Sequence, residues 1–101
     1  MKIEFEEWGK WSTAVECVAL YGRVDGRPFR IAFSGTALSE LFGLPRKPFV
    51  LQEAFRVNQA FMNEIARDVI ETGRLREDGS VMLHKEDLLP YFERRAATAP
   101  A

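Results

Sequence analysis

The stretch from Ala14 to Leu38, AVECVALYGRVDGRPFRIAFSGTAL, decides the fold. It holds two β-rich runs, residues 14–21 and 27–33, and apolar side chains recur at alternate positions in the second run. Between the runs, Asp25-Gly26 is a strong hairpin signal, because glycine accepts the positive φ that a tight turn demands. The stretch therefore predicts a pair of antiparallel strands.

A third strand is predicted before this hairpin. Residues 2–6 alternate polar and apolar side chains, with Ile3 and Phe5 on one face. The segment 8–12, WGKWS, is interpreted as a turn-like break that carries two aromatic residues. Three strands in this order predict an antiparallel meander.

Helical spacing follows the third strand. Ser34 is a candidate N-cap for a short helix, and Gly43 suits the left-handed position after its end. After a linker at 46–48, apolar residues recur at gaps of three and four over residues 49–72. This spacing predicts one long helix, which Gly73 ends.

The last part of the chain predicts either a tight hairpin or a single late strand over residues 75–83. A short final helix is expected next, with Asp87 as its N-cap and Pro90 in its first turn. Residues 96–101 have nothing to bury and are expected to form a frayed tail after a single domain at 1–95. The predicted fold class is α+β, an antiparallel meander of three to five strands packed on one long and two short helices.

Composition excludes several classes of protein. The 101 residues are 47% hydrophobic and 29% charged, which is typical of a small globular domain. The net charge of −1 gives no overall attraction for nucleic acid or anionic lipid. A single cysteine, an acidic N-terminal segment and the lack of a long apolar run predict a cytoplasmic protein without a membrane partner.

Several short motifs lie along the chain in a characteristic order and spacing. They are Val24–Arg27 in the hairpin, Phe33–Leu38 at the start of the first helix, Glu53–Gln59 and Ile65-Ala66 in the long helix, and Gly79–Val81 and Glu86–Leu88 near the end. Together they resemble the bacterial family known as domain of unknown function 1488, over roughly residues 3–89 of this chain. The resemblance implies an α+β fold and a bacterial cytosolic setting, and it carries no activity.

No catalytic or metal-binding pattern is present in the sequence. A Ser-His or Cys-His mechanism would have to use His84, the only histidine, and no nucleophile motif accompanies it. Cys17 lies in an apolar run and is expected to pack as a small hydrophobic residue. We therefore predict no catalytic residue, no metal ligand and no cofactor, which argues against an enzyme without excluding one.

Three features are candidate interaction surfaces. Arg23, Arg27 and Arg30 gather around the hairpin, where they either contact phosphate or an acidic partner, or form a solvated strand face. Trp8 and Trp11 either anchor a partner or cover the core. Asn58 interrupts the apolar stripe of the long helix, and it either fixes register in a homodimer or bonds within one chain.

These features favour a non-catalytic protein-interaction module that binds a protein partner or itself. The alternative is a nucleic-acid-binding protein that uses the hairpin at Arg23, Arg27 and Arg30, against which the net charge of −1 counts. An accessory subunit of an enzyme is the second alternative.

Overall fold

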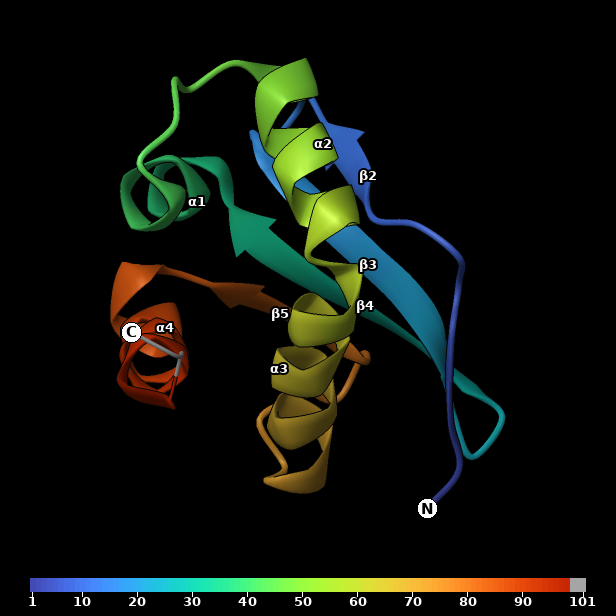
Figure 1. Ribbon diagram of the computed structural model, residues 1–101. Coiled ribbons are helices and arrows are strands. Elements are labelled where there is room, and N and C mark those ends of the chain that lie inside the picture. Colours follow the sequence, from blue (N-terminus) through green and yellow to red (C-terminus); the bar gives the residue numbers. More distant parts are fainter. Residues whose placement is uncertain (99–101) are drawn as a thin grey trace.

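The structure, a computed structural model, describes residues 1–98 as a sheet of five strands and four helices (Figure 1). The strands are β1 (Ile3–Phe5), β2 (Lys10–Ser12), β3 (Cys17–Val24), β4 (Arg27–Ser34) and β5 (Ser80–Leu83). The helices are α1 (Gly35–Phe42), α2 (Pro48–Val57), α3 (Gln59–Glu71) and α4 (Lys85–Thr98). The strand order is β1-β3-β4-β5, and β2 also pairs with β3. The fold is α+β, as the sequence predicts.

The central hairpin is confirmed. Strands β3 and β4 are antiparallel, from the pair Cys17–Ser34 to the pair Val24–Arg27. Asp25 and Gly26 form the turn with φ values of 50° and 82°. Strand β3 is shifted relative to the predicted run 14–21, because residues 13–16 form a turn before it begins.

The first residues extend this hairpin along one edge. Strand β1 pairs antiparallel with residues 22–24 of β3, which confirms the third strand. Strand β2 pairs with residues 17–19 of β3, so the segment 8–12 is not simply a turn. The sequence hides β2 because Trp11 is its one apolar residue and Gly9 lies just before it, so the segment resembles a turn.

At the other edge the sheet is not a pure antiparallel meander. Strand β5 is a single strand, one of the two alternatives for residues 75–83, and it lies parallel to β4. Three helices separate β4 from β5 in the chain, and parallel neighbours require such a crossover.

The short helix α1 is confirmed in detail. The Ser34 hydroxyl accepts a hydrogen bond from the backbone N–H of Ala37 at 3.3 Å, and Gly43 ends the helix with a φ of 67°. The single long helix over 49–72 is wrong, because α2 and α3 are separated at Asn58. The described residues thus form four helices where the sequence predicted three.

Helix α4 begins earlier than predicted. Asp87 is not its N-cap: helix α4 starts at Lys85, and the Asp87 carboxylate accepts from the backbone N–H of His84 at 2.9 Å. Pro90 consequently lies inside the helix rather than in its first turn. The helix continues to Thr98, into the predicted tail 96–101, and residues 99–101 lie outside the described residues.

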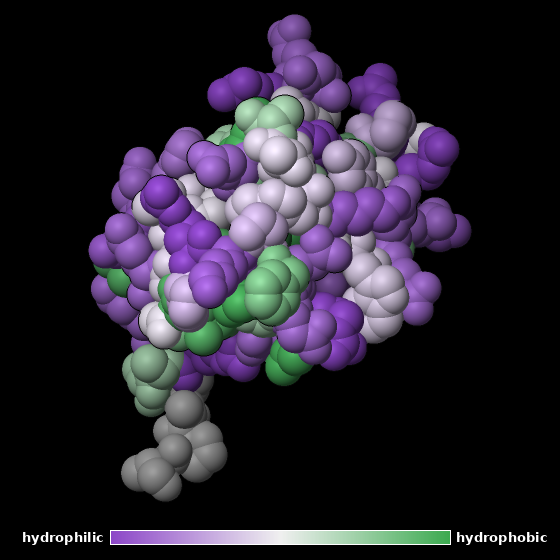
Figure 2. Space-filling model, turned by 90° about the horizontal axis from the view of Figure 1, so that it is seen from above, coloured by the Kyte–Doolittle hydropathy of each residue, from purple (hydrophilic) through white to green (hydrophobic). Residues whose placement is uncertain are grey.

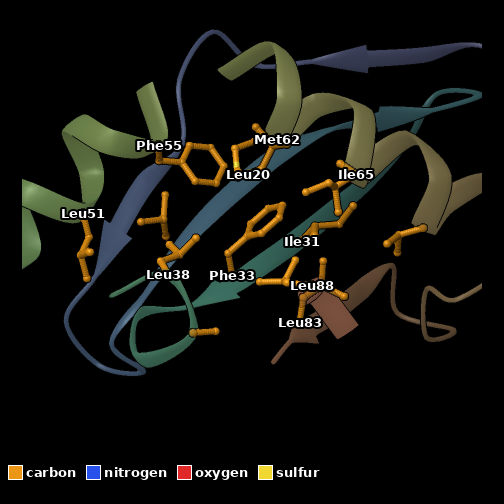
Figure 3. Packing of buried hydrophobic residues seen from close by; sticks show 14 of the residues in the cluster. Leu20, Ile31, Phe33, Leu38, Leu51, Phe55, Met62, Ile65, Leu83 and Leu88 are labelled. Atoms are coloured by element: carbon orange, nitrogen blue, oxygen red, sulfur yellow. The ribbon is translucent and has the colours of Figure 1, made fainter. Parts of the chain in front are cut away.

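The hydrophobic core lies between one face of the sheet and the helices (Figure 3). Strands β3 and β4 contribute alternate residues, among them Leu20, Ile31 and Phe33, and every helix adds at least one buried side chain. Phe33 meets Phe55 of α2 edge to face, with ring centroids 5.0 Å apart. The residues between these core positions belong to the opposite face of the sheet, called the outer face below.

Candidate interaction surfaces

A groove between two exposed aromatic side chains lies where the chain enters β2. Trp8 is 44% exposed and Phe49, in the first turn of α2, is 74% exposed. Between them is a groove of about 250 Å³ lined by Trp8, Gly9, Phe49, Gln52, Glu53 and Arg56, called the Trp8 groove below. Seen from the end of the molecule where α1 and α2 lie, a hydrophobic patch is surrounded by hydrophilic surface (Figure 2).

Polar contacts fix the walls of the Trp8 groove. The Arg56 guanidinium lies over the Trp8 ring, 5.8 Å from its centroid. Glu53 accepts from Arg56 Nε at 2.9 Å, and this bond lowers the pKa of the Glu53 carboxyl. The Gln52 side chain accepts from the backbone N–H of Trp11 at 3.0 Å, which ties α2 to β2. Because both walls are held, little further ordering is needed when a partner binds.

The two tryptophans do not form one site. Trp11 is half-buried and packs against the core, with its ring beside Gly35. It lines a small cavity of about 50 Å³ that includes Arg46 and Pro48, which is separate from the Trp8 groove. Of the two tryptophans, Trp8 is therefore the more exposed.

The three hairpin arginines are also not brought together. Arg23 and Arg30 lie on the outer face, whereas strand alternation places Arg27 on the other side of β4. Arg23 Nη1 donates to the carbonyl of Gly26 at 3.2 Å, at the turn. Arg30 lies along the sheet and donates to the hydroxyl of Tyr21 at 3.3 Å.

Cys17 lies beneath Arg30 on this outer face. Its side chain is fully buried, and Arg30 Nη2 is 4.0 Å from Sγ. Burial raises the pKa of the Cys17 thiol, and the nearby guanidinium offsets only part of this effect. The thiol is therefore held in its protonated, weakly nucleophilic form.

The amide of Asn58 bonds within the chain. Asn58 Nδ2 donates to the carbonyl of Ala54 at 2.8 Å, and its backbone N–H donates to the same oxygen at 3.1 Å. The side chain thus joins α2 to the start of α3.

A second and larger groove lies between α3 and α4. It has a volume of about 520 Å³ and is lined by Ala60, Phe61, Glu64, Ile65, Asp68, Tyr91, Arg94 and Arg95. We call it the α3–α4 groove. Its carboxylates come from α3 and its guanidinium groups from α4. The sequence does not reveal it, because Phe61 and Ile65 fit the core stripe and the charges resemble a solvated helix face.

Aromatic and polar contacts join the two helices around the α3–α4 groove. Phe92 packs edge to face against Phe61, with centroids 5.1 Å apart, and the Arg95 guanidinium lies 4.3 Å from the centroid of Phe61. Near Asp68, the hydroxyl of Tyr91 donates to the carboxylate, and Arg74 also bonds to the hydroxyl. Burial and the Asp68 carboxylate raise the pKa of Tyr91.

A third groove, of about 260 Å³, is lined by residues of β1, β3 and β4 and by Glu6, which follows β1; the strand residues are Glu4, Phe5, Tyr21, Gly22, Arg23, Pro28 and Phe29. Within residues 1–98, no three His, Cys, Asp or Glu side chains come together as a metal ion would require. No helix over the same residues has both the length and the apolar character needed to cross a bilayer. His84 precedes α4, where its backbone N–H bonds to Asp87.

Comparisons with known proteins give one structural relative. No protein-family model matches the chain, and no curated protein matches it either. It is similar to a crystal structure of a protein of unknown function from Shewanella loihica PV-4, assigned to the domain of unknown function 1488 family. The TM-score is 0.71 at 16% identity, over 84% of this chain and 97% of that chain. The chain therefore shares the fold of this family, as the resemblance implies.

Proposed function

We propose that this protein is an interaction module that binds a partner protein at the Trp8 groove. The observation that carries the proposal is the pair of exposed aromatic side chains, Trp8 and Phe49, on either side of one groove. Tryptophan is among the residues that contribute most to protein–protein interfaces, since burial removes a large apolar area from water.

The size of the Trp8 groove supports a side chain as its occupant. At about 250 Å³ it lies below the ~300–1,000 Å³ that is usual for small-molecule and cofactor sites. A single large apolar side chain from a partner would fit between the two rings. The Arg56–Glu53 pair at the rim would then face the partner's backbone or polar groups.

Charge supports a partner with basic residues beside that apolar anchor. Glu6 and Glu7 precede Trp8 and are exposed, and Glu53 lines the groove. Lys10 lies 3.6 Å from Glu6, and Arg56 pairs with Glu53, so these five side chains together carry a net charge of −1. Such complementarity accelerates association and makes the rate sensitive to salt.

The test is a pull-down with the tagged full chain from a native lysate of the source organism, at low and high salt. The wild-type chain, Trp8→Ala and Phe49→Ala are compared with Val15→Ala, which removes a 49% exposed side chain outside the groove. Circular dichroism checks that each variant folds. We expect a stoichiometric protein partner that binds wild type and Val15→Ala equally, and binds Trp8→Ala at least ~30-fold more weakly, as hot-spot truncations do.

Two results would overturn this function. A partner protein that binds Trp8→Ala as well as it binds wild type would place the interaction elsewhere. Nucleic acid that co-purifies at low salt and leaves as salt rises would favour the nucleic-acid alternative, because phosphate contacts weaken with salt. Arg23 and Arg30 on the outer face would then be the first residues to replace.

A further inference from the structure

Two side-chain donors of the Trp8 groove have no hydrogen-bond partner. Trp8 Nε1 and Gln52 Nε2 find no acceptor within residues 1–98. The side-chain acceptors that line the groove are already used, because Gln52 Oε1 accepts from Trp11 and the Glu53 carboxylate accepts from Arg56. An occupant of the groove is therefore expected to supply acceptors to these donors.

The Trp8 groove also has an open aromatic face. The Arg56 guanidinium lies over the Trp8 ring, whereas the Phe49 ring is 74% exposed and meets no other ring or cation within residues 1–98. A flat and rigid apolar group can therefore stack on Phe49 inside the groove.

Strand addition does not fit this site. A peptide that extends the sheet at β2 would need the outward backbone donors of that edge. The N–H of Trp11 already bonds to Gln52, and the N–H of Gly9 bonds to the Gln59 side chain at 3.4 Å. The two glutamine side chains thus take the place that a further strand would occupy.

Two other modes of peptide recognition also fit poorly. An amphipathic helix needs a long apolar groove that receives side chains from several turns, and the Trp8 groove has only two aromatic residues in about 250 Å³. A phosphorylated or acidic segment needs available cations, but Arg56 is paired with Glu53. An extended segment that binds without adding a strand remains.

We propose that the occupant of the Trp8 groove is a proline-rich segment in the polyproline II conformation, with a basic residue beside it; this inference rests on the proposed function. Proline has no backbone N–H, so such a segment presents carbonyl acceptors to Trp8 Nε1 and Gln52 Nε2. A proline ring stacks on Phe49. The segment is extended before it binds, so little conformational entropy is lost.

Glu7 gives the basic residue of the segment its place. Glu7 directly precedes Trp8, is exposed, and forms no ion pair within residues 1–98. Glu6 and Glu53, in contrast, are paired with Lys10 and Arg56. An arginine or lysine next to the prolines would therefore meet the Glu7 carboxylate.

Selection from a random dodecapeptide phage library tests the inference. Peptides are selected on the tagged full chain and counter-selected on Trp8→Ala, so that the peptides kept are those that require the Trp8 groove. We expect closely spaced prolines next to arginine or lysine in these peptides. The best peptide is then synthesised together with a copy in which glycine replaces every proline. The copy should bind at least ~tenfold more weakly, because the ring contact and the preformed conformation are both lost.

Variants of the chain test each contact by fluorescence anisotropy of the labelled peptide. Phe49→Ala should weaken binding at least ~30-fold, as hot-spot truncations do. Trp8→Phe keeps a ring but loses the indole N–H, and should weaken binding about 2–10-fold, the usual worth of one hydrogen bond. Val15→Ala should bind as wild type does. Circular dichroism checks that each variant folds.

The role of Glu7 has its own matched pair of variants. Glu7→Gln should slow association and reduce its dependence on salt, because a charge at the rim acts mainly on the association rate. Glu71→Gln neutralises an exposed carboxylate of α3 outside the groove and should change neither quantity.

Three outcomes would overturn the inference. Peptides that require Trp8 but lack proline would do so, and so would a glycine copy that binds as tightly as the proline peptide. Both results would leave the proposed function standing. The third is a library that yields no peptide able to distinguish wild type from Trp8→Ala. The pull-down then decides the proposed function separately, because a partner protein lost with Trp8→Ala would still support it.

Discussion

Gly9 and Phe55 lie so close that no side chain fits between them. A Cβ atom placed on Gly9 would be 2.5 Å from Cε1 of Phe55 and 2.8 Å from Cγ1 of Val18. Gly9 is buried, and the backbone therefore crosses directly over the core beside Trp8.

Replacing Gly9 with alanine should therefore destabilise the fold. Phe55 and Val18 are both fully buried, so they have no space in which to move away from the added methyl group. We expect the free energy of unfolding to fall by about 1–3 kcal/mol, the range for overpacked cores. Urea denaturation measures the loss. The exposed Thr13→Ala is the control, and an unchanged midpoint for Gly9→Ala would show that the core accepts the methyl group.

The cap of α1 gives a second prediction. Ser34→Ala removes the hydroxyl that accepts from the backbone N–H of Ala37, so this donor loses its partner. The free energy of unfolding should fall by about 1 kcal/mol. Ser34→Asn keeps an acceptor and should retain most of that stability. Equal losses in the two variants, measured by urea denaturation, would mean that the hydroxyl has another role than capping.

The thiol of Cys17 should be protected in the folded protein. It is fully buried and its pKa is raised, so both access and thiolate formation are suppressed. Ellman's reagent should label it slowly under native conditions and completely in denaturant. In Thr13→Cys/Cys17→Ala the thiol is moved to an exposed turn and should react at once. Fast native labelling of Cys17 would show that the outer face opens readily.

Tyr91 should make the protein lose stability at alkaline pH. Because its pKa in the folded state is raised above the unfolded value, the folded protein retains the phenol proton more strongly. The resulting stabilisation is fully present below about pH 10 and is lost as the pH rises through the folded value.

A comparison of variants isolates this contribution. The free energy of unfolding of Tyr91→Phe, measured by urea denaturation, should fall less steeply above about pH 10 than that of wild type. Tyr21→Phe removes the other phenol and serves as the control. If the free energy of unfolding fell equally with pH in wild type and Tyr91→Phe, burial and Asp68 would not raise the pKa of Tyr91 in the folded protein.

Local signals predicted the parts of the fold that local chemistry determines. The turn at Asp25-Gly26 and the cap at Ser34 are each specified by residues within a few positions, and both are found where the sequence placed them. The break at Asn58 was missed because apolar spacing continues across it. At Asn58 the backbone leaves helical geometry, with φ of −103° and ψ of 23°, and the side chain adds a second bond to the Ala54 carbonyl.

Long-range pairing was beyond these signals. Strand β5 pairs with β4 because the three helices between them bring the chain back to the edge of the sheet. A short stretch of sequence carries no information about such a long-range arrangement. The same limit applies to the Trp8 groove and the α3–α4 groove, which are each lined by residues far apart in the sequence. Trp8 is a candidate from the sequence, but Phe49 is only the first residue of the predicted long helix, and the fold brings it to the same groove as Trp8. The charged residues of the α3–α4 groove likewise line one groove only because the fold brings α3 and α4 together.

The parallel pair of β4 and β5 also bears on how the chain folds during synthesis. The hairpin of β3 and β4 can form as soon as Ser34 leaves the ribosome, but β5 is translated about forty-five residues later. Until then β4 is an unprotected edge whose outward backbone groups can pair with another nascent chain. The helices α1–α3 emerge in this interval and can cover Ile31 and Phe33 before the edge is closed.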